Sequence, residues 1–227
     1  RNYVGYRDDK LGIGEDGESV VVADTAWPRP SVSGKLEIYC QYKADTLNSM
    51  GYSPDGTFKP YPNYVAAPEG REGAFVDGVV GGEPSAYPFV VYNPHYLRRA
   101  HPVLDNAPWL REAWPNPVFL NASDAAAKGV SDGDTVRVFN AHGATLRTAS
   151  VTEIVMPGCV GLPHGAWLDY DEEAGIDRAG TDNVLCGTVT SGMGTSGYNN
   201  YNCDFERYDG EALAADCTLP QRIVSLD

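Results

Sequence analysis

The sequence predicts a mainly β protein built around a small barrel, with a few short helices and an extended N-terminal arm. Residues 115–152 read as strand, short helix, turn, strand, hairpin and strand. An apolar run at 87–92 predicts a further strand, whereas residues 51–87 show no sustained period. A short helix wedged between strands indicates a small barrel.

The helix inside this stretch is marked at both ends. Asn121 or Ser123 can cap its first turn, because a short polar side chain there accepts a hydrogen bond from a free backbone N–H. Gly129 can adopt the left-handed conformation that ends a helix. The sequence between them therefore predicts a short, alanine-rich helix.

Turn residues separate the strands that follow. Residues 131–134, Ser-Asp-Gly-Asp, predict a tight turn, and residues 141–143 predict a hairpin. Between them, residues 135–140 alternate and place Val136 and Val138 on one face. The hairpin joins this strand to the next one.

The first part of the chain is expected to be an arm. Leu36 and Ile38 alternate onto one face, which predicts one strand near 35–40. Residues 51–87 are rich in Pro, Gly, Tyr and Asp, and so long a loop usually wraps another surface or links domains. The predicted organisation is therefore an N-terminal arm and linker at 1–86, the barrel at 87–208 and a C-terminal tail at 209–227.

Charge narrows the classes of partner. The formal net charge is −14 over 227 residues, which argues against a nucleic acid because phosphate neutralisation needs a surplus of Lys and Arg. A small anionic cofactor remains compatible, since it needs only a few local arginines and backbone N–H groups. No apolar run approaches the roughly 18 residues of a membrane helix, so direct membrane insertion is not expected.

The cysteines and histidines lack the spacing of metal ligands. No Cys-x-x-Cys pair occurs, and reduced thiols fit the pattern better than a disulfide framework: the cysteines are Cys40, Cys159, Cys186, Cys203 and Cys217. Neither H-x-x-x-H nor H-E-x-x-H occurs among the histidines, which are His95, His101, His142 and His164. By residue type alone, His142 is expected in a turn and His164 as a hydrogen-bonded polar residue.

Polar and basic residues follow the apolar strand at 87–92. Residues 93–101 read Asn-Pro-His-Tyr-Leu-Arg-Arg-Ala-His. A buried strand that delivers polar residues at its end is a common way to build a binding site. Taken alone, however, Arg98 and Arg99 would more often be a solvated pair than ligands.

Several short motifs follow one another between residues 26 and 208. They are S-G-K-L-E-I-Y at 33–39, H-Y-x-x-R-x-H at 95–101, N-x-x-D-A-x-x-x-G-V-x-D-G-D-x-V-x-V-x-N-x-x-G at 121–143, V-M-P-G at 155–158, G-A-W at 165–167, N-V-L at 183–185 and a closing Asn-rich loop. In this order they resemble the C-terminal molybdopterin-dinucleotide-binding domain of the dimethyl sulfoxide reductase family. Members of that family are molybdenum or tungsten oxidoreductases. Each motif is weak by itself, but their order is specific.

This resemblance implies a six-stranded double-psi β-barrel that closes over bis(molybdopterin guanine dinucleotide), with molybdenum, in the parent enzyme. It implies contacts from the loop after the first barrel strand, from N-V-L and from a late polar loop: Asn93, Pro94, His95, Tyr96, Arg99, His101, Pro102, Val103, Asn183, Asn199 and Asn200. Arg99 could pair with a pyrophosphate or pterin oxygen, and an asparagine amide can read both donors and acceptors. By residue type alone, Asn199 and Asn200 would be turn residues.

Three positions depart from the family pattern. Pro102 stands where relatives usually carry Ser or Thr, and it has neither a hydroxyl nor an N–H to donate. Val103 replaces a residue that is usually polar, and His164 stands where relatives often have Glu.

The expected function follows from the resemblance. No nucleophile–base constellation can be named, so no catalytic residue and no metal ligand is expected in this chain. The cofactor would carry the redox chemistry, with the metal ligand and any iron–sulfur ligands in earlier domains. Because the chain begins with Arg1 rather than Met, we expect an inactive fragment of a catalytic subunit. Its parent would perform oxygen-atom or two-electron transfer, as in anaerobic respiration.

The resemblance also implies partners. These are the preceding domains of the same subunit and, where the parent is a complex, an iron–sulfur electron-transfer subunit and a membrane anchor subunit. Family members are often exported to the bacterial cell envelope, and a cytoplasmic location is the alternative. Two other classes stay open: a stand-alone double-psi barrel that binds a substrate or protein without a cofactor, and a small hydrolase whose site cannot be named.

Overall fold

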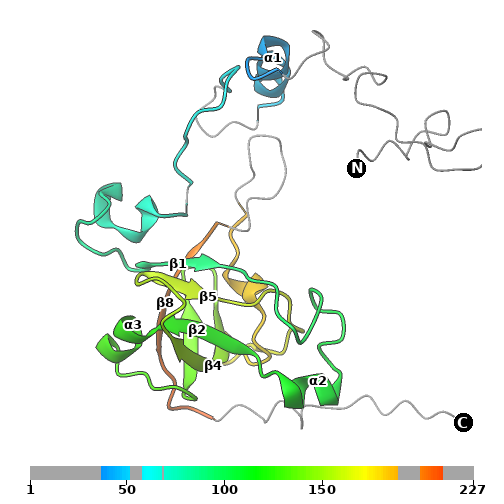
Figure 1. The fold of residues 1–227 in the computed structure, drawn as a ribbon, viewed down its shortest axis with the longest axis vertical. Helices are drawn as coiled ribbons and strands as arrows, with labels where there is room; N and C mark the ends of the chain where they lie inside the picture. Colours follow the sequence, from blue (N-terminus) through cyan, green and yellow to red (C-terminus); the bar gives the residue numbers. More distant parts are fainter. Residues whose placement is uncertain (1–36, 52–57, 68, 189–199, 212–227) are drawn as a thin grey trace, which may run out of the picture. The chain divides into compact units, whose positions relative to one another are not determined.

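The computed structural model describes residues 37–51, 58–67, 69–188 and 200–211 (Figure 1). The chain divides into two compact units, Arg1–Asn63 and Tyr64–Asp227. The predicted site residue Asn199 and most of the predicted tail lie outside the described residues.

The first unit contains one helix, α1 (Gln41–Ser49), among its described residues. The Cys40 N–H donates to Pro60 O at 2.6 Å, and Asn48 Nδ2 donates to Phe58 O at 3.1 Å, so the chain folds back onto the helix. The strand predicted near 35–40 is wrong over its described part, residues 37–40. Ile38 is 69% exposed, so this apolar side chain does not pack in a core.

The second unit is built on a closed barrel of six strands. They are β1 (Phe89–Tyr92), β2 (Pro117–Asn121), β3 (Thr135–Phe139), β4 (Ala144–Thr152), β5 (Cys159–Gly161) and β8 (Asn202–Arg207). Their order is β2-β5-β1-β8-β3-β4, and a parallel pairing of β4 with β2 closes the ring. Two short strands, β6 (Tyr170–Asp171) and β7 (Ile176–Asp177), extend the sheet beside β4. The predicted mainly β fold with a six-stranded barrel is confirmed.

The barrel interior holds the hydrophobic core. Along β3 the burial alternates, and Val136 and Val138 are fully buried, as the sequence predicts. Phe89 and Phe205 meet inside the barrel with ring centroids 4.8 Å apart. Burial of these apolar surfaces is the main source of stability for the frame.

Short helices connect the strands. In α3 (Ala122–Ala127) the Asn121 side chain accepts from Ser123 N at 2.9 Å, and Gly129 has a φ of 67°. Both predicted ends of this helix are therefore confirmed, with Asn121 as the cap. The helix α2 (Pro108–Ala113) begins with Pro108, whose missing N–H costs nothing at a first helical position. Figure 1 shows α2 and α3 on opposite sides of the barrel.

Three 3-10 turns complete the described elements: η4 (Glu72–Ala74), η5 (Val76–Gly78) and η6 (Asp182–Leu185). None of the helices in the described part of the chain has the length and apolar character needed to cross a membrane.

The segment ahead of β1 is tied to the barrel. Asn202 Nδ2 donates to Gly70 O at 2.9 Å, and Glu69 Oε1 lies 2.7 Å from Nε2 of His142 in the predicted hairpin turn. Residues 69–70 therefore pack on the barrel although they lie within the predicted arm. The boundaries predicted at residues 86 and 208 stay a prediction.

Candidate functional site

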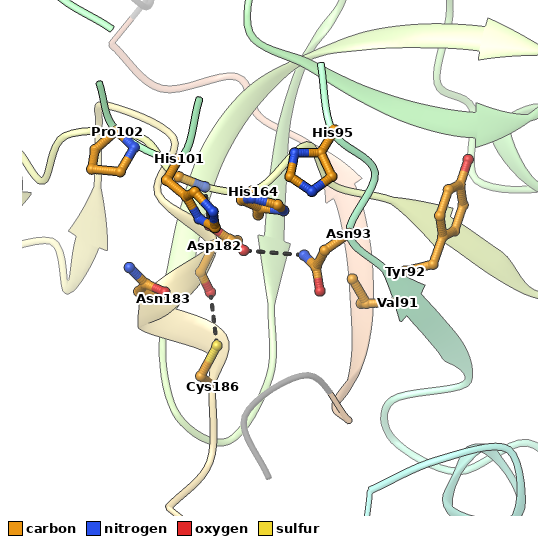
Figure 2. Close-up of a pocket in the computed structure, with 11 residues that line it drawn as sticks. Val91, Tyr92, Asn93, His95, His101, Pro102, His164, Asp182, Asn183 and Cys186 are labelled. Atoms are coloured by element: carbon orange, nitrogen blue, oxygen red, sulfur yellow. Dashed lines mark hydrogen bonds between the residues drawn. The ribbon is translucent and has the colours of Figure 1, made fainter. Parts of the chain in front are cut away.

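A cavity of about 670 Å³ lies at the carboxyl end of β1, within the size range of small-molecule sites. The strands β1 and β5 pair in parallel, and the loops that follow them line the cavity together with residues of η6. The lining residues come from these three places, as Figure 2 shows: Val91, Tyr92, Asn93, His95, His101, Pro102, His164, Gly165, Asp182, Asn183 and Cys186.

Three imidazole rings gather on one side of the cavity (Figure 2). The ring centroid of His164 lies 4.5 Å from that of His95 and 4.5 Å from that of His101, and His95 and His101 are 5.8 Å apart. The Nε2 atom of His164 is buried and has no hydrogen-bond partner among the described residues. This differs from the hydrogen-bonded residue expected at that position.

Backbone geometry brings two of these rings together. His101 has a φ of 54°, and Gly165 has a φ of 77°. A Cβ atom at position 165 would stand 2.3 Å from the carbonyl carbon of His101, so only glycine fits there. The close approach of the two backbones places His164 beside His101.

Asp182 organises the floor of the cavity. It is 4% exposed, its Oδ1 accepts from Gly165 N at 2.9 Å, and its Oδ2 accepts from Asn93 Nδ2 at 3.1 Å. Asn93 Nδ2 also lies 2.8 Å from the Tyr201 hydroxyl. Burial, aided by the Asp182 carboxylate, raises the pKa of Tyr201, so this hydroxyl stays protonated. The three side chains join β1, η6 and the start of β8.

Arginines form a buried layer behind the cavity. Asp105 is fully buried, and its Oδ1 lies 3.1 Å from Nε of Arg98 and 3.1 Å from Nη1 of Arg99. Nη2 of Arg111 stands 3.8 Å from Oδ2 of the same carboxylate. One aspartate thus holds three guanidinium groups, so positive charge exceeds negative charge in this cluster.

Two of the arginines support the cavity wall directly. Arg99 donates from Nε to His164 O at 3.3 Å and from Nη2 to Pro163 O at 3.0 Å, and Arg147 donates from Nη2 to Pro163 O at 2.9 Å. Burial and the neighbouring Arg99 lower the pKa of Arg147 to about 10. Its Nε has no partner among the described residues. Both guanidinium groups therefore fix the backbone that carries His164.

The structure brings part of the predicted set together. The predicted residues that line the cavity are Asn93, His95, His101, Pro102 and Asn183. Arg99 lies behind the wall, and Tyr96 packs edge-on against Phe119 at 5.8 Å. Pro94, Val103 and Asn200 are described but do not line the cavity, and Val103 is 61% exposed. Cofactor contact by any of these residues stays a prediction.

Several lining residues were not predicted from the sequence, among them Asp182, Gly165 and Cys186. Two of these residues lie in or next to motifs that the sequence shows: Gly165 is the first residue of G-A-W, and Asp182 directly precedes N-V-L. Cys186 Sγ lies 3.6 Å from Asp182 O, and burial raises the pKa of its thiol to about 11. Over the described residues, no group of three or more His, Cys, Asp or Glu side chains has the geometry to hold a metal ion.

The family model described as "Molydopterin dinucleotide binding domain" matches residues 89–202, about half of the chain. The chain is 33% identical over 159 residues to the probable dimethyl sulfoxide reductase chain YnfF of Escherichia coli K12, covering 70% of this chain and 19% of that protein. It is 33% identical over 196 residues to the dimethyl sulfoxide/trimethylamine N-oxide reductase of Cereibacter sphaeroides, covering 81% and 21%. It thus spans about a fifth of the length of these relatives.

A solved structure shares the fold. Acetylene hydratase from Pelobacter acetylenicus superimposes with a TM-score of 0.62 at 16% identity, over 90% of this chain and 29% of that one. At that sequence identity the similarity shows a shared fold only. The match over residues 89–202 and the relatives above show that this chain belongs to the molybdopterin-dinucleotide-binding domains of the dimethyl sulfoxide reductase family.

Proposed function

We propose that this chain is the cofactor-binding domain of a larger molybdenum oxidoreductase, and that its cavity receives part of a bis(molybdopterin guanine dinucleotide) cofactor. One observation carries the proposal. The cavity at the end of β1 gathers predicted cofactor contacts from separate segments, His95 and His101 from one loop and Asn183 from η6. Residues that lie far apart in the sequence therefore face one space.

The residues present fit the chemistry of a dinucleotide. Pterin and guanine edges carry both donors and acceptors, which the Asn183 amide can satisfy. Phosphate oxygens accept hydrogen bonds, which imidazoles can donate. The buried, unpartnered Nε2 of His164 is an orphan polar atom inside the cavity, and such atoms are rare unless a ligand or water serves them.

The chain's own residues bind and orient. Asp182 fixes the Asn93 amide and the Gly165 backbone, while Arg99 and Arg147 hold the carbonyl groups beneath His164. When bound, the cofactor supplies the redox chemistry. The contribution of this domain is therefore a preorganised wall of donors on a rigid barrel.

The parent would transfer an oxygen atom or two electrons. The relatives named dimethyl sulfoxide and trimethylamine N-oxide reductases support this reaction class. We propose the preceding domains of the same subunit as the first partner, with an iron–sulfur subunit and a membrane anchor where the parent is a complex. Either the cell envelope or the cytoplasm fits this proposal. A barrel without a cofactor is not favoured, because the family match covers residues 89–202, from the start of β1 to the first residue of β8.

The proposal is tested on the parent protein, purified anaerobically. Molybdenum is measured by mass spectrometry, and pterin by the fluorescence of its oxidised derivative. We expect both, in a fixed ratio to protein. An active parent that contains neither metal nor pterin would overturn the proposal.

A further inference from the structure

We propose that His164 is a binding residue of this cavity, and that it forms with His95 and His101 a cradle of three imidazoles for the phosphate groups of a dinucleotide. The identity of the whole ligand rests on the proposed function. The phosphate preference of the cradle rests on the geometry and charge below and is tested separately.

The ring nitrogens of the cradle are open to a ligand. No hydrogen bond from a described residue reaches a ring nitrogen of His95, His101 or His164, and Nε2 of His164 is buried as well. All three rings line the cavity. A buried polar atom without a partner costs free energy, so a ligand that serves it gains affinity.

The charge behind the cradle favours an anion. Among the described residues, buried arginines outnumber buried aspartates by four to three: Arg98, Arg99, Arg111 and Arg147 against Asp105, Asp177 and Asp182. This surplus of positive charge stands out in a chain whose net charge is −14. Inside a protein the effective dielectric constant is low, so these buried charges act on a nearby ligand more strongly than they would in water.

Two of the buried arginines contact the backbone of the cradle. Arg99 Nε reaches the carbonyl oxygen of His164 itself, at 3.3 Å, and Nη2 of Arg147 reaches Pro163 O, one residue earlier, at 2.9 Å. The two guanidinium groups therefore bind the backbone that carries His164. They hold the cradle in place and add positive potential where a phosphate would sit.

The carboxylate of Asp182 in the cavity lining is already hydrogen-bonded. Asp182 is the acidic side chain among the described lining residues, and each of its carboxylate oxygens accepts a hydrogen bond, from Gly165 N and from Asn93 Nδ2. Its charge is thus stabilised by donors on the floor, while the imidazole donors remain for the ligand.

The test is a calorimetric titration of the 227-residue chain with inorganic pyrophosphate at fixed pH and low salt. Four proteins are compared: the wild type, His164→Phe, His164→Gln and His142→Phe. Phenylalanine keeps an aromatic ring but lacks the two nitrogens, whereas glutamine keeps a hydrogen-bond donor. His142→Phe is the matched control, because His142 lies in the hairpin and does not line the cavity. Circular dichroism verifies that each variant is folded.

We expect the wild type and His142→Phe to bind alike and His164→Phe to bind about tenfold more weakly, the size expected for a lost charge-assisted hydrogen bond. His164→Gln should lie between them. A titration with a phosphate-free pterin separates the two ligand chemistries. Equal pyrophosphate binding by the wild type and His164→Phe would contradict the proposed cradle. A chain that binds the phosphate-free pterin but does not bind pyrophosphate would also contradict it.

The outcomes also separate the two proposals. A parent that contains the dinucleotide, combined with a chain whose pyrophosphate affinity is insensitive to His164, refutes the cradle alone. A cofactor-free parent, combined with a chain that loses pyrophosphate on His164→Phe, refutes the proposed function alone.

Discussion

Asp182 and Gly165 are joined by a hydrogen bond of 2.9 Å, from the Gly165 N–H to Asp182 Oδ1, and this contact places the backbone of the third imidazole against the loop of the other two. The same carboxylate receives the Asn93 amide from β1. One buried side chain therefore determines how three separate segments meet at the cavity.

Replacing Asp182 by Asn tests this role. The new amide would direct an N–H₂ group at a backbone N–H or at another amide, leaving a buried donor unsatisfied. We expect a loss of about 1–3 kcal/mol in the free energy of unfolding, measured in urea. Asp171→Asn in the short strand β6 makes the same chemical change in a half-buried ion pair with Arg178 and should have a smaller effect. Similar losses in the two variants would contradict the role of Asp182.

A pair of glycines separates close approach from backbone strain. Gly165 and Gly129 both have positive φ, 77° and 67°. An alanine at 129 meets no atom within 4 Å, so it should cost only the left-handed strain of about 1–2 kcal/mol. An alanine at 165 would also collide with His101, so it should cost clearly more and weaken pyrophosphate binding. Equal losses in urea unfolding would show that the approach of 165 to 101 is not tight.

Arg99 is expected to matter more for stability than the sequence alone suggests. By resemblance, Arg99→Ala should lower cofactor occupancy more than it lowers the thermal stability of the domain. The structure instead places Arg99 in a buried network with Asp105 and Asn116, so its loss should cost roughly 3–5 kcal/mol. Arg137→Ala, which breaks an exposed pair with Glu206, is the control and should cost less than about 1 kcal/mol. A marginal stability loss in Arg99→Ala together with lost cofactor would favour the contact role.

The thiol of Cys186 should resist alkylation in the folded chain. Burial, and after it the Asp182 carboxylate, raises its pKa to about 11, so at pH 8 about one thiol in a thousand is the reactive thiolate. Its labelling by iodoacetamide should accelerate about tenfold for each pH unit up to that pKa. Peptide mass spectrometry of native and urea-unfolded chain measures the difference. Native labelling at pH 8 as fast as in urea would contradict the burial of this thiol.

Local patterns predicted the frame well. The alternation of Val136 and Val138, the Asn121 cap and the Gly129 stop depend on neighbours within a few residues, and all three appear in the structure. No strand forms over residues 37–40, the described part of the strand predicted near 35–40, because alternation indicates which face is apolar but not whether a partner strand exists. Ile38 has the period of a strand and remains exposed.

The site could be predicted only in part, because its supports depend on tertiary contacts. Asp182 and Asn93 are 89 residues apart in the chain and meet through the pairing of the barrel strands. The burial of Arg98 and Arg99 requires a turn in which His101 and Leu104 adopt positive φ, which their residue types do not announce. Residue types therefore indicated the loop that lines the cavity but not the carboxylates that hold this loop in place.

The most direct measurement is an experimental structure of the parent protein, purified anaerobically with its cofactor. We expect dinucleotide density in the cavity at the end of β1, with an oxygen atom of the ligand within hydrogen-bond distance of His164 Nε2 and with Asn183 beside it. A cofactor bound elsewhere, with this cavity filled by solvent or by protein, would contradict the proposed function.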